Sequence, residues 1–187
     1  VCQHRAREKA LFESTGVPCA PYALIDSPAS LAEAARQDLF PGILKTATLG
    51  YDGKGQQVVQ QADDLAQAWQ VLGQQSCVLE RRMPLALEFS LIVARARDGQ
   101  MVSLPAQQNL HRAGILAVTE VPAPALTAEQ ARRARDHVEG LARAMDYVGV
   151  LCVEFFVLTD GRLLANEMAP RPHNSGHASM DACDVCQ

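Results

Sequence analysis

Residues 151–177 read LCVEFFVLTDGRLLANEMAPRPHNSGH, and this stretch decides which fold the sequence predicts. Two runs of apolar, β-branched and aromatic residues, 151–158 and 162–168, flank Thr159-Asp160-Gly161. Asp-Gly between two such runs is the strongest short-range signal for a β-hairpin. We therefore predict an antiparallel hairpin closed by a two-residue loop of Asp160 and Gly161.

A two-residue loop places Glu154 directly opposite Glu167 on one face of the hairpin. Two facing carboxylates repel each other and destabilise an apolar hairpin unless a cation lies between them. Mg²⁺ suits such a pair, because it binds proteins through one or two carboxylates and completes its shell with phosphates and water. A half-exposed hairpin whose glutamates both point to water fits the same spacing, and a longer loop would change the register. The spacing alone leaves both interpretations open.

Composition excludes several classes of protein. The chain has 187 residues, of which 48% are hydrophobic and 20% charged, as in an ordinary globular protein of one domain or two small lobes. The net charge of −4 and the single tryptophan argue against a nucleic-acid partner. No apolar run approaches the length of a membrane span, so we expect no membrane partner and a cytoplasmic location.

The six cysteines are scattered and lack the density of a disulfide scaffold. Cys183 and Cys186 form a lone C-x-x-C motif, and the further ligands of a zinc site are not visible beside it. Both ends of the sequence look cut, because Val1 is not an initiator methionine and residues 179–187 begin a helix without a cap. We therefore expect a fragment of a longer protein.

The patterns before Pro84 predict alternating helices and strands. Arg5, Arg7 and Lys9 in the opening helix are typical of a solvated face, and Ser27 is a good N-cap for the second helix. The predicted helices are 3–14, 28–37 and 63–72, and the predicted strands are 20–25, 42–46, 57–60 and 77–80.

After Pro84 the patterns predict an antiparallel sheet and one long helix, which Thr127 and Gln130 open with a capping box. The overall order indicates an α+β protein with two lobes, 1–84 and 85–187. The predicted strands of the second lobe are 88–96, 101–104 and 115–121, with a polar turn at 109–114 and the helix at 127–145.

Lys45 ends an apolar strand, a position that suggests an anionic ligand, although many such lysines reach the surface. Residues 49–56, LGYDGKGQ, contain three glycines within six residues, which lets the backbone approach an anion closely. This is not a Walker loop, because Gly55 stands where Ser or Thr should follow Lys54. A plain glycine-rich hairpin loop fits the same residues.

Five segments in order, LKTATLGYDGKGQ, EFSLIVARARDG, NLHRAGI, YVGVLCVEFFV and NEMAPRPHNSGH, resemble the ATP-grasp ligases. More narrowly they resemble the 5-(carboxyamino)imidazole ribonucleotide synthases of purine biosynthesis, for which NEMAPRPHNSGH is the most specific segment. The resemblance runs from about Arg5 to Gln187. It implies an α+β ATP-grasp fold whose two lobes clasp ATP, here without the family's N-terminal and C-terminal domains.

The resemblance also implies a reaction. ATP and bicarbonate give carboxyphosphate, which carboxylates the exocyclic amine of aminoimidazole ribonucleotide and leaves ADP and phosphate. Carboxyphosphate hydrolyses readily, so the site must exclude water. ATP and Mg²⁺ are the implied cofactors, and a homodimer is implied for the full-length protein. Two alternatives are another ATP-grasp carboxylase or ligase acting on a different amine, and a nucleotide-binding fragment without catalysis.

Residue roles follow from the resemblance one position at a time. Glu154 and Glu167 match the family's magnesium carboxylates, and Lys45 matches the lysine at the inner phosphates. Arg171, His173 and Asn174 match positions that handle bicarbonate, carboxyphosphate and the ribonucleotide phosphate, where an arginine fork suits an anion. The other matched positions of the ATP site are Arg5, Gly50, Tyr51, Asp52, Gly53, Lys54, Gly55, Gln56, Glu80, Arg81, Arg82, Met83, Glu88, His111 and Asn166.

Within the glycine-rich loop, Tyr51 and Asp52 also match residues placed at the imidazole substrate. The loop departs from the family pattern at Leu49, where many relatives carry a second glycine. It departs again at Ala47 and Thr48, where many relatives carry a basic pair. These departures imply a stiffer loop or altered phosphate contacts.

Overall fold

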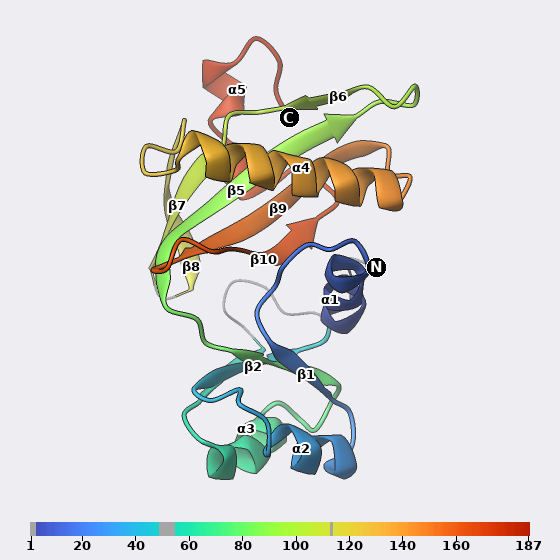
Figure 1. Ribbon diagram of the computed structural model, residues 1–187, viewed down its shortest axis with the longest axis vertical. Coiled ribbons are helices and arrows are strands. Elements are labelled where there is room, and N and C mark those ends of the chain that lie inside the picture. Colours follow the sequence, from blue (N-terminus) through green and yellow to red (C-terminus); the bar gives the residue numbers. More distant parts are fainter. Residues whose placement is uncertain (1–2, 49–54, 113) are drawn as a thin grey trace. The chain divides into compact units, whose positions relative to one another are not determined.

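The computed structural model of the protein describes residues 3–48, 55–112 and 114–187 (Figure 1). Helices and antiparallel strands occur in both halves of the described chain, so the predicted α+β class is confirmed. Within these residues no helix has the length and apolar character that a membrane crossing requires.

The described residues group into two compact units. The first unit contains Gln3–Ala10 and Ala20–Pro84, and the second contains Leu11–Cys19 and Leu85–Gln187. The chain therefore passes from one unit to the other after Pro84. Residues 11–19, which the sequence-based division placed in the first lobe, group with the second unit because Phe12 and Val17 are buried in its core.

The described part of the first unit holds a sheet of four strands in the order β1-β4-β2-β3, and every neighbouring pair is antiparallel. Along β2, Leu44 is fully buried while Lys45 is less so, because successive side chains of a strand point to opposite faces. Leu44 packs with Leu65 and Trp69 under helices that lie on one face of the sheet (Figure 1). The elements are β1 (Tyr22–Ile25), α2 (Pro28–Ala34), β2 (Gly42–Thr46), β3 (Gln56–Val59), η1 (Ala62–Asp64), α3 (Leu65–Val71) and β4 (Cys77–Arg81).

The second unit is built on a larger antiparallel sheet in the order β10-β9-β5-β7-β8, with β6 paired to the other end of β5. The elements are β5 (Leu85–Arg95), β6 (Met101–Ser103), β7 (Gln107–Arg112), β8 (Ile115–Glu120), α4 (Ala128–Ala144), β9 (Gly149–Leu158), β10 (Leu163–Ala169), η2 (Asn174–Gly176) and α5 (Ser179–Ala182). Helix α1 (Arg5–Ser14) contributes its first residues to the first unit and its last residues to the second.

Helix α4 covers one face of this sheet (Figure 1). Its predicted capping box is confirmed, since the Thr127 side chain accepts from the Gln130 N–H and the Gln130 side chain accepts from the Thr127 N–H. The apolar residues of the helix lie on one stripe, in which Val138 and Leu141 are fully buried against the sheet.

The polar turn expected at residues 109–114 is wrong, because residues up to Arg112 form strand β7. The polar residues are accommodated by hydrogen bonds inside the sheet. Buried Asn109 donates through Nδ2 to Ser90 Oγ at 2.6 Å, and its Oδ1 accepts from Thr119 Oγ1 at 3.3 Å. A polar sequence is typical of a turn, but here neighbouring strands supply the hydrogen-bond partners.

We expect Asn109→Leu to lower the free energy of unfolding by about 1–3 kcal/mol, because it leaves the Ser90 hydroxyl buried without its partner. Thr119→Val removes the more exposed hydrogen bond of the same chain and should lower the free energy of unfolding by less than Asn109→Leu does. Urea denaturation of the two variants compares these costs. A larger loss for Thr119→Val than for Asn109→Leu would contradict this account.

Candidate functional site

The hairpin of β9 and β10 does not close as predicted. Leu158 N–H donates to Arg162 O at 2.9 Å, so the loop holds three residues, Thr159, Asp160 and Gly161, rather than two. Gly161 has a φ of 84°, a conformation that favours glycine. On the loop side of the hairpin, Leu163 pairs with Val157 and Ala165 pairs with Phe155, one residue away from the predicted register.

A β-bulge at Asn166 restores the predicted register in the part of the hairpin farther from the loop, from Glu167 onward. Glu167 pairs with Glu154, so the prediction that these carboxylates lie opposite each other is confirmed although the predicted loop is wrong. The reason lies in the core. A two-residue loop without a bulge would place Asn166 opposite buried Phe155, whereas the bulge lets Ala165 and Met168 face the core instead.

The two carboxylates occupy a confined position. The Glu154 side chain is only 15% exposed. Burial and then the charge of Glu167 raise the pKa of Glu154 to about 7. A cation beside the pair would favour the ionised form of both groups.

Glu154 and Glu167 fit Mg²⁺, which prefers oxygen ligands and needs few of them from the protein. The described residues contain no group of three or more His, Cys, Asp or Glu side chains that could hold a metal by themselves. Such a site suits Mg²⁺ that is shared with phosphate oxygens, and it does not suit a zinc centre built from protein ligands alone.

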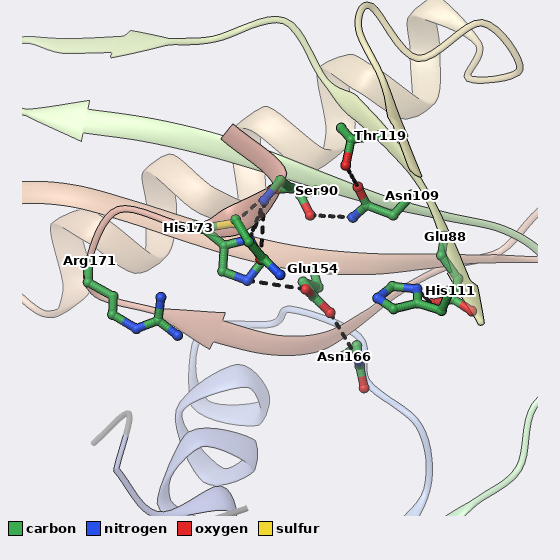
Figure 2. Close-up of polar contacts among 12 residues, drawn as sticks. Glu88, Ser90, Asn109, His111, Thr119, Glu154, Asn166, Arg171 and His173 are labelled. Carbon is green, nitrogen blue, oxygen red and sulfur yellow. Dashed lines mark hydrogen bonds and ion pairs between the residues drawn. The ribbon is translucent and has the colours of Figure 1, made fainter. Parts of the chain in front are cut away.

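Two further side chains contact Glu154 (Figure 2). Asn166 Nδ2 donates to Glu154 Oε2 at 3.5 Å, and His173 Nε2 lies 3.3 Å from Glu154 Oε1. The bulge that restores the register thus also brings the Asn166 amide to the carboxylate. Asn166, Glu167 and His173, which the sequence places in one motif, lie around a single carboxylate of β9.

His173 is held in one orientation. Its Nδ1 accepts from the Ser175 N–H at 3.3 Å and lies 2.9 Å from Ser175 Oγ. Burial and then the charge of Arg171 lower the pKa of His173 to about 4, so the ring is neutral near pH 7. Because Nδ1 accepts, the single ring proton resides on Nε2, which faces Glu154.

Two matched residues of the motif, Arg171 and Asn174, are exposed. Arg171 is exposed, and its Nη1 donates to Pro172 O at 2.9 Å. In Figure 2 the Arg171 side chain lies apart from the cluster around Glu154. Asn174 is exposed, and its Oδ1 accepts from the Ser175 N–H at 3.1 Å. The structure therefore brings His173 to the carboxylates and leaves Arg171 and Asn174 open to solvent.

A second cluster of site residues lies on β5 and β7. His111 Nδ1 lies 2.8 Å from Glu88 Oε2, and this hydrogen bond raises the pKa of His111. The charges of Glu154 and Glu167 also raise it, which places all four groups in one electrostatic neighbourhood. Glu88, His111 and apolar residues such as Leu87 line a cavity of about 380 Å³.

In the first unit, Lys45 and Lys9 share one carboxylate. Lys45 Nζ donates to Glu80 Oε2 at 3.1 Å, and Lys9 Nζ lies 3.4 Å from the same oxygen. Lys9 is 1% exposed, so the expectation that Arg5, Arg7 and Lys9 form a solvated face is wrong for Lys9. Its burial is stabilised by Glu80, a long-range partner that no local pattern reveals.

The carboxylate of Glu80 is strongly influenced by these cations. Burial pushes its pKa upward, but Lys45 and then Lys9 outweigh burial, so that the pKa is lowered. Arg5 contributes to the same lowering, and its backbone N–H donates to Ala47 O at 2.8 Å. Glu80 Oε1 is buried and has no hydrogen-bond partner among the residues that the structure describes.

The remaining matched positions are less informative. Arg81 forms an exposed ion pair with Asp38, with Nη1 2.7 Å from Oδ2, and Arg82 N–H donates to Pro41 O. Met83 follows β4 outside any regular element. Gly55 O accepts from Thr46 N–H, and Gln56 pairs with Lys45 at the start of β3. The matched positions outside the described residues are Gly50, Tyr51, Asp52, Gly53 and Lys54.

Sequence reasoning missed Lys9 and Ser175 as neighbours of matched positions. The sequence did contain a signal for Ser175, because this residue lies inside NEMAPRPHNSGH and directly follows the matched residues His173 and Asn174. Lys9 carried none, since a lysine in a charged helix is most often solvated.

Comparison with known proteins identifies the family. The ATP-grasp domain model matches residues 10–187. The N5-carboxyaminoimidazole ribonucleotide synthase of Bacillus subtilis strain 168 is 38% identical over 187 residues, which cover 100% of this chain and 49% of that protein. The chain thus spans about half the length of the curated relatives it matches.

Solved structures agree with this result. The Staphylococcus aureus N5-carboxyaminoimidazole synthetase in complex with ADP matches with a TM-score of 0.91 at 34% identity, covering 99% of this chain and 49% of that one. The Aspergillus clavatus enzyme with ADP and 5-aminoimidazole ribonucleotide matches with a TM-score of 0.88 at 26% identity, covering 99% and 48%. With a family model matched over residues 10–187, this chain belongs to the ATP-grasp family.

Proposed function

We propose that this chain is the ATP-grasp core of an enzyme that carboxylates aminoimidazole ribonucleotide with ATP and bicarbonate. Carboxyphosphate would form first, and the exocyclic amine of the ribonucleotide would then displace phosphate, giving 5-(carboxyamino)imidazole ribonucleotide, ADP and phosphate. The similarity over the whole chain to N5-carboxyaminoimidazole ribonucleotide synthases carries the proposal. The relative from Aspergillus clavatus, whose structure holds ADP and 5-aminoimidazole ribonucleotide, supports the substrates.

Glu154 and Glu167 are the residues that would hold Mg²⁺. When bound, the ion would neutralise charge on the ATP phosphates during transfer of the γ-phosphoryl group to bicarbonate. Asn166 orients the carboxylate of Glu154 through its amide, and His173 presents a neutral N–H to the same group. The opposed pair of half-buried carboxylates supports this assignment, because it is destabilising unless a cation is bound.

The first unit would hold the inner phosphates and the adenine. Lys45 supplies the positive charge for the phosphates, and Arg5 adds to the positive potential there. The segment Glu80–Met83 would read adenine through its backbone. The buried Glu80 Oε1, which lacks a hydrogen-bond partner among the described residues, would suit a donor such as an exocyclic amine. The glycine-rich loop 50–56 would close over the phosphates.

In the second unit, Glu88 and His111 line the cavity described above and would contact the ribose and the nucleotide. Arg171, His173 and Asn174 would handle bicarbonate, carboxyphosphate and the phosphate of the ribonucleotide. Exposure leaves the planar fork of Arg171 accessible to an anion. Tyr51 and Asp52 would lie at the imidazole.

Phosphate release by the whole gene product tests the proposal. We expect release that requires ATP, Mg²⁺, bicarbonate and aminoimidazole ribonucleotide together. Release that another amine supports equally well would identify a different ATP-grasp ligase, and ATP binding without release would identify a nucleotide-binding protein. We further propose a homodimeric full-length enzyme in the cytoplasm, which light scattering and cell fractionation would check.

Arg171→Ala tests the anion role. We expect kcat/KM for the ribonucleotide to fall about 100-fold, as when one charged donor to a developing anion is removed. Arg162→Ala is the matched control, because Arg162 is an exposed arginine paired with Asp160 in the hairpin loop. Initial-rate kinetics compare the two variants. Activity of Arg171→Ala within a few-fold of the control would exclude the anion role.

A further inference from the structure

Gln187 holds both backbone groups of His173. Its side-chain Nε2 donates to His173 O at 2.7 Å, and its Oε1 accepts from His173 N–H at 2.9 Å. A side-chain amide that engages the N–H and the C=O of one residue reproduces the paired hydrogen bonds of an antiparallel ladder. We refer to these two bonds as the Gln187 clamp.

The clamp is itself held in place by its neighbours. Ser179, which is 3% exposed, accepts through Oγ from Gln187 N–H at 3.2 Å and donates to Gly176 O at 2.7 Å. A Cβ atom at Gly176 would lie 2.6 Å from the Gln187 amide, so the amide packs directly on the backbone of this glycine. Two residues that no motif assigned, Ser179 and Gln187, therefore fix the backbone of the loop that carries His173.

The clamp acts on the position of the imidazole. Gln187 holds the backbone of His173, and the Ser175 N–H donates to Nδ1 of the His173 ring. The other ring nitrogen, Nε2, then lies 3.3 Å from Glu154 Oε1. Without the clamp, the backbone of His173 could rotate and carry the ring away from the carboxylate. A shift of about 1 Å in a positioned group is enough to cost a hundredfold in rate.

We infer that Gln187 is a positioning residue, which acts through the His173 backbone to hold the imidazole against Glu154. The catalytic use of this imidazole rests on the proposed function. The Gln187 clamp rests only on the two hydrogen bonds to the His173 backbone. The two are therefore tested by separate measurements.

The first measurement is the tautomer of His173 in the whole gene product labelled with ¹⁵N-histidine. The His173 signals are those missing from His173→Ala. In the wild type we expect the shifts of an imidazole protonated on Nε2. In Gln187→Met, which keeps the length of the side chain and removes both hydrogen bonds, we expect shifts averaged between the two tautomers. Unchanged His173 shifts in a folded Gln187→Met protein would overturn the inference.

Gln70→Met is the matched control, because Gln70 is an exposed glutamine on α3. It should leave the His173 signals unchanged. If Gln187→Met does not fold, Gln187→Glu serves instead, since it keeps the acceptor for His173 N–H and removes only the donor. We then expect the same averaging, and wild-type shifts in Gln187→Glu would overturn the inference.

The second measurement is kinetic. We expect Gln187→Met to lower kcat about 10- to 100-fold while the KM for ATP changes less than about twofold. In a protein that already carries His173→Ala, the same substitution should lower kcat by less than about a further twofold, because Gln187 acts through the imidazole. Full additivity of the two losses would overturn the inference. If the whole gene product releases no phosphate with the ribonucleotide, the proposed function has failed, and the tautomer measurement still decides the clamp.

Discussion

We expect Glu167→Gln to lower the magnesium-dependent kcat/KM for ATP about a thousandfold in the whole gene product, a loss of about 4 kcal/mol in charge stabilisation. The amide keeps the shape of the side chain and one oxygen, but it removes the charge that opposes the cation. Rates measured over a range of Mg²⁺ concentrations should show that added magnesium does not restore the wild-type rate.

The same substitution should have the opposite effect on stability. Without Mg²⁺, Glu167→Gln relieves the repulsion with Glu154 and should raise the free energy of unfolding by up to about 1 kcal/mol. Glu13→Gln, at an exposed position of α1, is the matched control and should change neither property. Wild-type activity in Glu167→Gln would show that the metal assignment is wrong.

Glu80→Gln should have the largest effect on stability. We expect the free energy of unfolding to fall by about 3–5 kcal/mol, because Lys9 is buried and loses the carboxylate that stabilises its charge. Asp38→Asn removes the partner of Arg81 in an ion pair on the surface and should cost less than about 1 kcal/mol. Urea denaturation near neutral pH compares the two. Equal losses would contradict the account of a buried ion cluster.

The pH dependence of stability follows from the same group. Lys45 and Lys9 outweigh burial and hold the pKa of Glu80 below its usual value of 4.5. Because the folded state has the lower pKa, the contribution of this carboxylate is fully present above pH 4.5 and is lost as the pH falls through the folded pKa. Denaturation below pH 4.5 should therefore show a shallower decline in Glu80→Gln than in the wild type. Adding Lys9→Met to Glu80→Gln should recover part of the lost stability.

Much of the fold could be predicted because local patterns and tertiary packing agree. The capping box at Thr127 predicts where α4 begins, and the helical spacing of apolar residues such as Val138 and Leu141 predicts which face it buries. In the structure these residues pack against the sheet. Strand β2 has the bounds that the sequence predicts, Gly42–Thr46. At these positions the nearest neighbours in sequence supply the information.

The failures share a physical cause, which is dependence on distant partners. Asn109 lies in a strand because Ser90 and Thr119 bond its amide, and Lys9 is buried because Glu80 neutralises it. No window of sequence around Asn109 or Lys9 contains these partners. The pairing of Glu154 with Glu167 was predicted from a loop that is one residue too short. The extra residue of the bulge at Asn166 offsets the extra residue of the loop, so the two glutamates still pair.

The bulge at Asn166 separates the tip of the hairpin from its base. Thr159, Asp160 and Gly161 at the tip are exposed, and the strand segment between them and the bulge is anchored by the core. A length change at the tip during evolution would therefore alter the loop alone, with Glu154 and Glu167 still opposite each other. The tip is accordingly a suitable place to insert a short peptide tag or a fluorophore attachment site in order to follow the protein without disturbing these two carboxylates.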